Sequence, residues 1–500
     1  MSSPQMALAP TSARIPFQQL ANWAEARSGV LAFALCICFA VLSLALAAAR
    51  PFWFDEIITI SIARTHTFSD FVRGFLVGYD QTPPLNTLLV RVLCSRFGWT
   101  EMVARLPSVI FATAGLWILF RQIRRFTTGL FGLAAMSILL DTFLSRYACE
   151  ARPYALLFFA SALALSVWCS IPYSSSKAST RKSVLFGLAM LLTVLAHYYA
   201  VLVILPFAFD ELRSRPLRKA LSLRLACGIT GLGLGLLVQL PLVHAASQRR
   251  LTHFWASPSF HNLRASYGEI LVWLGFALVC VILVLSWSGV EQSRSIEPQS
   301  REERLGWFFL SIPIAGYVLA EVITHAFTPR YFVPVLAGLA LGVGGYLYRH
   351  YRNTLQVPLL ILLVTIPLFA QASFSSIRNA RTHVISGRTE VADFVDEMLP
   401  RFHNDGKLFV LVPIGKSYLE ARYYASDPTM LRGLHQPDLP VLPLAQDPLH
   451  IRYFSMDDIR QHARETAFIE PTSDLLSYLD RLGFHIHWRR TEPEAVVYVE

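Results

Sequence analysis

Apolar runs of about twenty residues recur along this chain of 500 residues as far as residue 373. An α-helix rises about 1.5 Å per residue, so a run of that length crosses the hydrocarbon core of a bilayer, about 30 Å thick. Only 16% of the residues are charged, against about 25% in soluble domains. We therefore expect a polytopic α-helical membrane protein. Single spans are expected at 30–49, 103–120, 128–144, 153–171, 224–245, 268–288, 305–325, 331–348 and 355–373.

Residues 183–212 form a longer apolar stretch with His197, Tyr198 and Tyr199 in its middle. Basic residues flank it on both sides: Lys177, Arg181, Lys182, Arg213, Arg215, Arg218, Lys219 and Arg224. Short loops rich in Lys and Arg stay on the cytoplasmic side of a membrane. Both flanks should therefore lie on that side. The stretch is then expected to form two short spans that turn at the histidine.

The charges of the loops set the expected topology. It has eleven spans, a cytoplasmic leader (1–29), a membrane module (30–373) with a long external loop (50–102), and a C-terminus outside the plasma (inner) membrane. The net charge of +10 comes mostly from short loops, which is typical of cytoplasmic anchoring. We therefore expect membrane lipids, and not nucleic acid, as partners. Most of the seven cysteines lie in apolar runs and act as small hydrophobic residues.

The composition changes after residue 373, where ordinary globular sequence begins. Helical spacing occurs at 389–402 and 473–483, and a run typical of a buried strand at 407–414. FHIHWRR and AVVYVE at the end of the chain are typical of a pair of strands. Residues 374–500 are therefore expected to form a small extracytoplasmic α/β domain.

Asp55 and Glu56 lie in RPFWFDEIITI, directly after the first span, among aromatic and aliphatic side chains. One interpretation is a pair of charges at a helix N-terminus, where they offset the helix dipole. The other is a general base or a metal ligand at the outer membrane surface. Adjacent carboxylates point in different directions, so one can face a substrate while an arginine holds the other.

The second polar cluster is YDQTPPL (79–85). Pro83 and Pro84 stop any preceding helix and fix the start of the next one. The cluster is either a turn with a helix cap or a place where Asp80 adds a second carboxylate facing Asp55. The helix expected at 85–97 is amphipathic and too short to span, so we expect it along the outer interface.

Two arginines open later spans on the outer side. Arg152 precedes Pro153 in SRYACEARPY, and a fixed cation at a helix N-terminus is suited to a phosphate. Simple anchoring to lipid phosphate is the alternative. Arg330 follows Pro329 in FTPRYFVP, where snorkelling is the alternative. Further candidate site residues accompany them: Glu150, as a partner of Arg152 or a metal ligand, Tyr154, Tyr331, and the aromatic residues His197 and Tyr198.

Five motifs together resemble the GT-C superfamily of membrane glycosyltransferases, over residues 28–375. They are FWFDE, YDQTPPL, EMVARLPSVIFATAG, EARPYALL and TPRYFVPVLAG. The chain is most similar to glycosyltransferase family 39, the polyprenyl-phosphate-mannose-type protein mannosyltransferases, whose bacterial relatives include the aminoarabinose transferase of lipid A. The resemblance implies a GT-C fold and a sugar donor carried on a polyprenyl phosphate.

The resemblance also implies site roles. An acidic residue in the first external loop is the catalytic base, a position that Asp55 matches, with Glu56 beside it. Arg152 and Arg330 match positions suited to the donor phosphate, together with Tyr331. Relatives often have His where this chain has Thr82, so one possible metal ligand is missing here. A divalent metal ion is therefore left open, and no cofactor is expected with certainty. The sugar-binding-like insert of the eukaryotic relatives is absent.

The expected function is an inverting transfer of a sugar to an acceptor on the extracytoplasmic side, with Asp55 as general base. The acceptor is left open between protein, lipid and glycan. A transporter or flippase of lipid-linked sugars is the alternative. It would need polar groups at mid-membrane and inverted repeats, whereas the polar clusters of this chain gather on one side.

Overall fold

The computed structural model describes residues 11–171, 177–214, 222–248, 256–288, 298–381, 390–413, 415–434, 449, 452–490 and 495–500. Its contacts form two compact units. One, here named the helical unit, comprises the described residues of Met1–Ala48, Thr82–Val243 and Thr252–Ser376. The other, the mixed unit, comprises those of Ala49–Gln81, His244–Leu251 and Ile377–Glu500. Residues 49–81, directly after the first span, are therefore grouped with the C-terminal residues.

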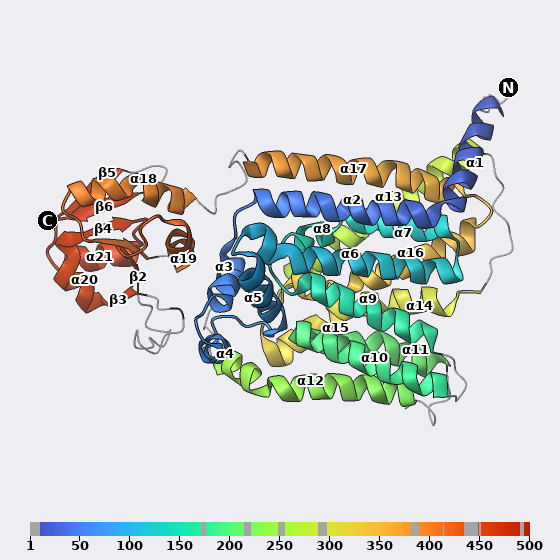
Figure 1. Ribbon diagram of the computed structural model, residues 1–500, viewed down its shortest axis with the longest axis horizontal. Coiled ribbons are helices and arrows are strands. Elements are labelled where there is room, and N and C mark those ends of the chain that lie inside the picture. Colours follow the sequence, from blue (N-terminus) through green and yellow to red (C-terminus); the bar gives the residue numbers. More distant parts are fainter. Residues whose placement is uncertain are drawn as a thin grey trace, which may run out of the picture. The chain divides into compact units, whose positions relative to one another are not determined.

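The helical unit is built almost entirely from helices, some of which extend by a few residues into the other unit (Figure 1). They are α1 (Thr11–Ala26), α2 (Ser28–Ala49), α5 (Leu85–Phe97), α6 (Glu101–Phe126), α7 (Gly129–Leu140), α8 (Phe143–Ala148), α9 (Tyr154–Ser170), α10 (Lys177–Ala196), η1 (Tyr198–Val203), α11 (Ile204–Ser214), α12 (Leu223–Gln248), α13 (Phe260–Ser288), α14 (Arg301–Phe308), η3 (Phe309–Ser311), α15 (Ile312–Leu319), η4 (Ala320–Thr324), η5 (Pro329–Phe332), α16 (Pro334–Tyr351) and α17 (Gln356–Arg381).

Within the described residues, seven helical stretches are long and apolar enough to cross a membrane. They are Ser28–Ala49, Glu101–Phe126, Ser179–Ala196, Leu223–Ala245, Phe260–Val284, Arg301–Thr324 and Gln356–Ala380. Two shorter apolar helices, Gly129–Leu140 and Tyr154–Ser170, accompany them. The multi-pass architecture is confirmed. The total of eleven spans stays a prediction.

The predicted break in the stretch 183–212 is present, because α10 ends at Ala196 and η1 begins at Tyr198. His197 is the residue between them, with an extended backbone. The predicted helix at 85–97 is α5, which starts directly after Pro84. Local signals placed both boundaries correctly.

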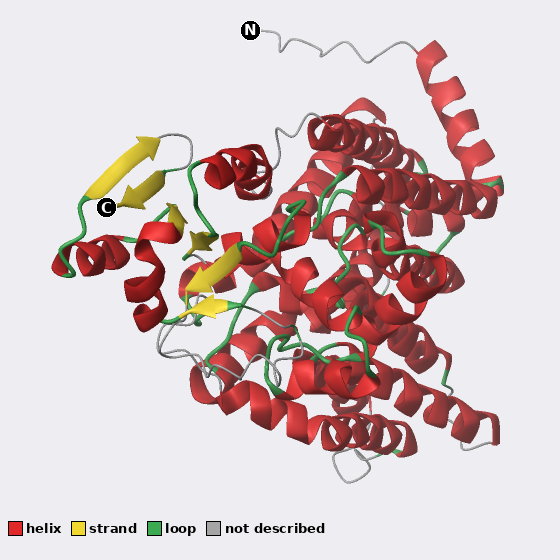
Figure 2. Ribbon diagram, turned by 60° about the vertical axis from the view of Figure 1, so that its left-hand side comes forward, coloured by secondary structure: helices red, strands yellow, loops and turns green. Residues whose placement is uncertain are grey.

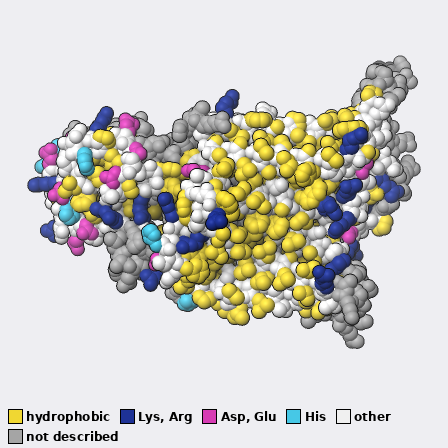
Figure 3. Space-filling model, viewed as in Figure 1, with side chains coloured by type: hydrophobic (Ala, Val, Ile, Leu, Met, Phe, Trp, Pro, Cys, Tyr) yellow, Lys and Arg dark blue, Asp and Glu magenta, His cyan; other side chains and the backbone are white. Residues whose placement is uncertain are grey.

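Small residues allow close packing inside the helical unit. A Cβ added to Gly306 in α14 would lie 2.4 Å from the backbone nitrogen of Gly342 in α16. A Cβ added to Gly115 in α6 would lie 2.6 Å from the ring of Phe158 in α9. Close backbone approach through small residues is how membrane helices associate without a hydrophobic driving force. Figure 3 shows one face of this unit, which is broadly apolar, with Lys and Arg gathered at the end that carries α1.

The mixed unit contains all the strands found in the described residues (Figure 2). Its helices are α3 (Phe54–Ala63), α4 (Phe68–Leu76), α18 (Glu390–Asn404), α19 (Gly415–Tyr424), α20 (Met456–His462), η6 (Ala463–Glu465) and α21 (Ser473–Arg481). Its strands are β1 (Phe409–Val412), β2 (Leu431–Leu434), β3 (Tyr453–Phe454), β4 (Thr466–Ile469), β5 (Ile486–Arg490) and β6 (Val496–Val499).

The six strands form one sheet in the order β3-β2-β1-β4-β6-β5. The first four are parallel, and β6 pairs antiparallel with both β4 and β5. The predicted closing pair of strands is thus β5 and β6, and the buried strand predicted at 407–414 is β1. Both β4 and β6 are buried along their whole length, since they lie inside the sheet.

Candidate functional site

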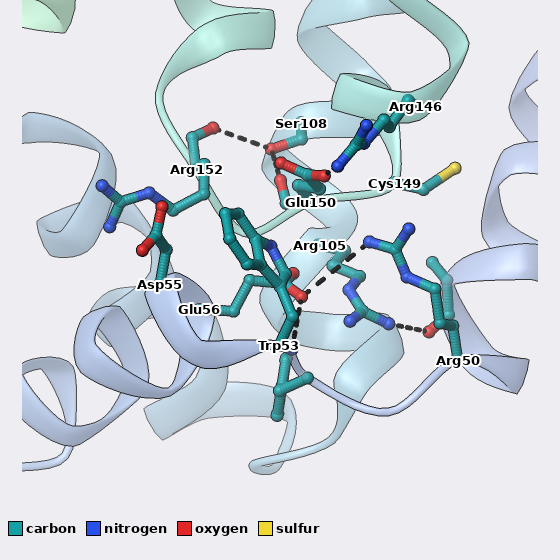
Figure 4. A network of polar contacts seen from close by, with 12 residues as sticks. Arg50, Trp53, Asp55, Glu56, Arg105, Ser108, Arg146, Cys149, Glu150 and Arg152 are labelled. Atoms are coloured by element: carbon teal, nitrogen blue, oxygen red, sulfur yellow. Dashed lines mark hydrogen bonds and ion pairs between the residues drawn. The ribbon is translucent and has the colours of Figure 1, made fainter. Parts of the chain in front are cut away.

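The loop between α8 and α9 carries Arg152 and is fixed by buried side chains. Ser108 Oγ of α6 donates a hydrogen bond to the carbonyl oxygen of Glu150 at 2.6 Å (Figure 4). Asn86 Nδ2 of α5 donates to the carbonyl oxygen of Ala151 at 3.3 Å. Two successive backbone groups of the loop are therefore satisfied by neighbouring helices. The guanidinium of Arg152, which is 5% exposed, leaves a backbone that is held in place.

Glu150 is buried in the same loop, with 1% of its surface exposed. Its carboxylate accepts a hydrogen bond from Nε of Arg146 at 3.4 Å, one helical turn earlier. The Arg146 side chain is itself 58% exposed. A charged partner at the surface therefore compensates a carboxylate in the interior, as buried charges require.

An aromatic cluster surrounds His197. The centre of its ring lies 4.6 Å from the ring of Tyr331 and 6.2 Å from that of Tyr154. The guanidinium carbon of Arg330 lies 5.8 Å from the centre of the Tyr154 ring. Tyr154 is the first residue of α9, directly after the arginine loop. Segments that are far apart in sequence therefore meet at this histidine.

The electrostatics of His197 place both predicted phosphate-binding arginines near it. Burial is the main cause that lowers the pKa of His197 to about 3, followed by the positive charges of Arg330 and Arg152. The imidazole is consequently neutral at physiological pH. Its Nδ1 accepts a hydrogen bond from the backbone N–H of Tyr199 at 3.2 Å, so the proton of the neutral ring lies on Nε2. The site offers two cations and one neutral N–H donor.

Tyr199 is a member of this cluster that the sequence placed in the aromatic turn but did not single out as a site residue. Its ring lies 5.0 Å from that of Tyr331, and its hydroxyl contacts Thr324 and the carbonyl oxygen of Ala326. It is buried, whereas its neighbour Tyr198 is half-buried. The sequence pair Tyr198-Tyr199 pointed to this turn. Only the tertiary contacts show that Tyr199 is the buried member of the pair.

Arg105 is a second residue that sequence reasoning missed. It is completely buried in α6, and its Nη1 donates a hydrogen bond to the carbonyl oxygen of Ala47 in the last turn of α2 at 2.7 Å. A cation at a helix C-terminus is stabilised by the helix dipole. An ionisable residue inside an expected span could have identified it, because such residues are costly and have specific partners.

In the mixed unit, Asp55 and Glu56 lie in the first turn of α3 and have different surroundings (Figure 4). Glu56 is fully buried, and its Oε2 accepts the backbone N–H of Trp53 at 3.2 Å. The same oxygen lies 3.9 Å from the guanidinium of Arg50. Asp55 is half-buried. Glu56 is therefore held by an arginine, as was expected of one of the two adjacent carboxylates.

Asp80 lies close to the helix that carries Asp55. The hydroxyl of Thr59 donates to Asp80 Oδ2 at 3.4 Å and to the carbonyl oxygen of Asp55 at 3.1 Å. Asp80 is only 5% exposed and Thr59 1%. Asp80 is therefore linked to α3 through Thr59, one helical turn after Asp55, a threonine that the sequence did not single out. That the carboxylate of Asp80 faces that of Asp55 stays a prediction.

The candidate residues thus fall into two groups. Asp55, Glu56 and Asp80 belong to the mixed unit, and Glu150, Arg152, Tyr154, His197, Tyr198, Arg330 and Tyr331 to the helical unit. The meeting of the two groups in one cavity stays a prediction. In the described part of the chain, no three His, Cys, Asp or Glu side chains form a group suited to a metal ion.

Comparison with solved structures identifies the fold. The apo structure of ArnT from Cupriavidus metallidurans aligns with a TM-score of 0.63 and 16% identity, over 94% of this chain and 97% of that one. The structure of the same protein bound to undecaprenyl phosphate aligns with a TM-score of 0.59 over the same shares, again at 16% identity. The chain has the ArnT fold. The expected polytopic helical membrane fold with a small C-terminal sheet is confirmed, and it is the fold of ArnT.

Other comparisons contribute less. The oligosaccharyltransferase of Archaeoglobus fulgidus, in complex with Zn and sulfate, aligns with a TM-score of 0.42 and 12% identity, over 80% of this chain and 62% of that one. This score is too low to support an inference. No protein-family model matches the sequence, and no curated protein matches it. The likeness to ArnT is one of fold, detected from structure and not from sequence.

Proposed function

We propose that this chain is a membrane glycosyltransferase that moves a sugar from a polyprenyl-phosphate donor to an acceptor on the extracytoplasmic side. One observation carries the proposal: Arg152 and Arg330 both act on His197, at the starts of two helices of an ArnT-like fold. The ArnT structure of this fold holds undecaprenyl phosphate. A pair of cations beside aromatic rings suits the same chemistry, a phosphate on a long isoprenoid chain.

The donor site is proposed to hold the phosphate between Arg152 and Arg330. The phosphate is a leaving group that already carries negative charge, so it needs cations and not a strong general acid. Tyr154 and Tyr331 provide aromatic walls. The neutral imidazole of His197 adds a donor at Nε2 without a third positive charge. The ordering of the arginine loop by Ser108 and Asn86 reduces the reorganisation needed when the phosphate binds.

The reaction is proposed as a single displacement. The acceptor oxygen forms a bond to the anomeric carbon while the bond from that carbon to the phosphate oxygen breaks, and the bonding pair leaves with the polyprenyl phosphate. Asp55 takes the proton of the acceptor hydroxyl as general base. Attack from the face opposite to the leaving group inverts the anomeric centre. Glu56, buried and paired with Arg50, supports the geometry of this turn.

The test is Asp55→Asn in membrane vesicles supplied with a panel of radiolabelled undecaprenyl-phosphate pentoses and hexoses. We expect the variant to fold and bind donor but to lose transfer, measured as release of undecaprenyl phosphate when cell-envelope acceptors are added. Asp70→Asn is the matched control, because Asp70 also lies in the first turn of a short helix, α4, and is likewise half-buried. Wild-type turnover by Asp55→Asn contradicts the proposal.

The same assay separates an enzyme from a flippase of lipid-linked sugars. An enzyme releases the polyprenyl phosphate when acceptor is present. A flippase moves the intact donor across the bilayer and cleaves nothing. Movement without cleavage by the wild-type chain would favour the transporter alternative. Mass spectrometry of envelope glycans from a deletion strain then identifies whether protein, lipid or glycan accepts the sugar.

A further inference from the structure

The chain entering α3 is bound by a helix that lies near the other end of the sequence. The backbone N–H of Phe52 donates a hydrogen bond to the hydroxyl of Tyr424 in α19 at 2.6 Å, across 372 positions. The ring of Phe52, which is 1% exposed, packs edge-on against the ring of Tyr423 at 5.7 Å. Both contacts lie inside the mixed unit. Residue 52 is three positions before Asp55.

α3 depends on such contacts. It has ten residues, and isolated helices shorter than about 12–15 residues are marginal in water. The indole side chain of its N-cap, Trp53, carries no hydrogen-bond acceptor for the N–H groups of the first turn. Glu56 instead accepts the N–H of Trp53, and Tyr424 accepts the preceding N–H. The contacts that hold the entry to α3 therefore include one within the segment and one from α19.

α19 is a rigid support because it is built into the sheet region, residues 390–500. It follows the central strand β1, and the hydroxyl of its buried Tyr418 donates to the carbonyl oxygen of Arg452 at 3.3 Å. Just beyond its end, the N–H and hydroxyl of Ser426 donate to Asp396 of α18 at 2.7 Å and 3.0 Å. A hydroxyl at the end of this helix therefore has a fixed position relative to the sheet.

We propose that the C-terminal sheet region positions the carboxylate of Asp55 by holding the entry to α3 through Tyr424. Tyr424 is then a positioning residue that acts through the backbone of Phe52. The inference rests on the proposed function of Asp55 and adds to it a role for the sheet region in the reaction. A displacement of about 1 Å in a reacting group can lower a rate by about 100-fold, so the loss of one hydroxyl is measurable.

The test is Tyr424→Phe, which removes the hydroxyl and keeps the ring. We expect kcat to fall about 10-fold with the KM for the polyprenyl-phosphate donor unchanged. Hydrogen–deuterium exchange of the α3 amides should become faster, because the start of the helix is no longer held. The exchange measurement needs no substrate and so reports on the contact independently of the enzyme activity.

Tyr418→Phe is the matched control. It is the same change in the same helix, but its hydroxyl binds within the sheet region, so α3 exchange and kcat should stay at wild-type values. Tyr423→Leu is a second variant that weakens the contact through the ring of Phe52 and should reproduce the effects of Tyr424→Phe. If Tyr424→Phe fails to fold, Tyr423→Leu tests the inference in its place.

Each outcome is decisive. Unchanged α3 exchange in Tyr424→Phe and Tyr423→Leu overturns the inference. Unchanged transfer in both variants, with transfer lost in Asp55→Asn, also overturns it. Unchanged transfer in Asp55→Asn overturns the proposed function instead, and the inference with it. Faster α3 exchange together with a lower kcat and an unchanged KM supports it.

Discussion

At the scale of single residues, His197 has the most unusual surroundings in the described part of the candidate site. It is 4% exposed, and burial together with the charges of Arg330 and Arg152 lowers its pKa to about 3. An ordinary histidine has a pKa of about 6.5. Between these two values the unfolded chain binds a proton that the folded chain does not. Acidification from about pH 6.5 towards pH 3 therefore reduces the free energy of unfolding through this residue.

The corresponding prediction concerns His197→Gln, in which an amide oxygen replaces Nδ1 as acceptor for the N–H of Tyr199. The thermal midpoint of the wild type should fall more steeply than that of the variant between pH 6.5 and pH 4. Thermal unfolding in detergent micelles at a series of pH values measures this. His244→Gln, a change of an exposed histidine, should follow the wild type. Parallel curves for wild type and His197→Gln would show that the residue is not neutral when folded.

At the scale of elements, the contact between α14 and α16 is set by glycine. A Cβ on Gly306 would lie 2.4 Å from the backbone nitrogen of Gly342 and 2.7 Å from the carbonyl oxygen of Gly338. These neighbours are backbone atoms, so they have no rotamer into which to move. Added volume must then separate the two helices.

We predict that Gly306→Ala destabilises the protein by about 1–3 kcal/mol, the usual cost of overpacking. Gly233→Ala in α12 is the matched control, because a Cβ there meets nothing within 4 Å. There the helix propensity of alanine should stabilise the helix by about 0.5–1 kcal/mol. Thermal midpoints of the two purified variants measure the difference. A midpoint for Gly306→Ala at or above the wild type would mean that α14 and α16 are not in contact.

At the scale of the whole molecule, the number of membrane crossings decides whether the two ends of the chain lie on the same side or on opposite sides. Eleven is odd, so the N-terminus and the C-terminus should lie on opposite sides of the membrane. A green fluorescent protein fused before residue 1 should be fluorescent in the cytoplasm, and an alkaline phosphatase fused after residue 500 should be active outside it. If the second fusion is expressed normally but has no phosphatase activity, the number of crossings is even.

The sequence predicted the elements of this fold better than its long-range contacts. The break at His197 followed from basic residues on both sides of one stretch, and the start of α5 from Pro84. Such signals act within a few residues, so a sequence displays them. The contact between Phe52 and Tyr424, and the burial of Arg105 against the end of α2, depend on how distant segments pack. No local pattern encodes them.

The distance in sequence between Phe52 and Tyr424 also has a consequence for synthesis of the chain. The two residues are 372 positions apart, and a ribosome adds about 5–20 residues per second. Once α3 has emerged, roughly 20–70 s pass before its partner on α19 exists. During that interval Phe52, which is 1% exposed in the finished protein, lacks its contacts with Tyr423 and Tyr424. Assembly of the mixed unit is therefore a late step in biogenesis, timed by translation of the final residues.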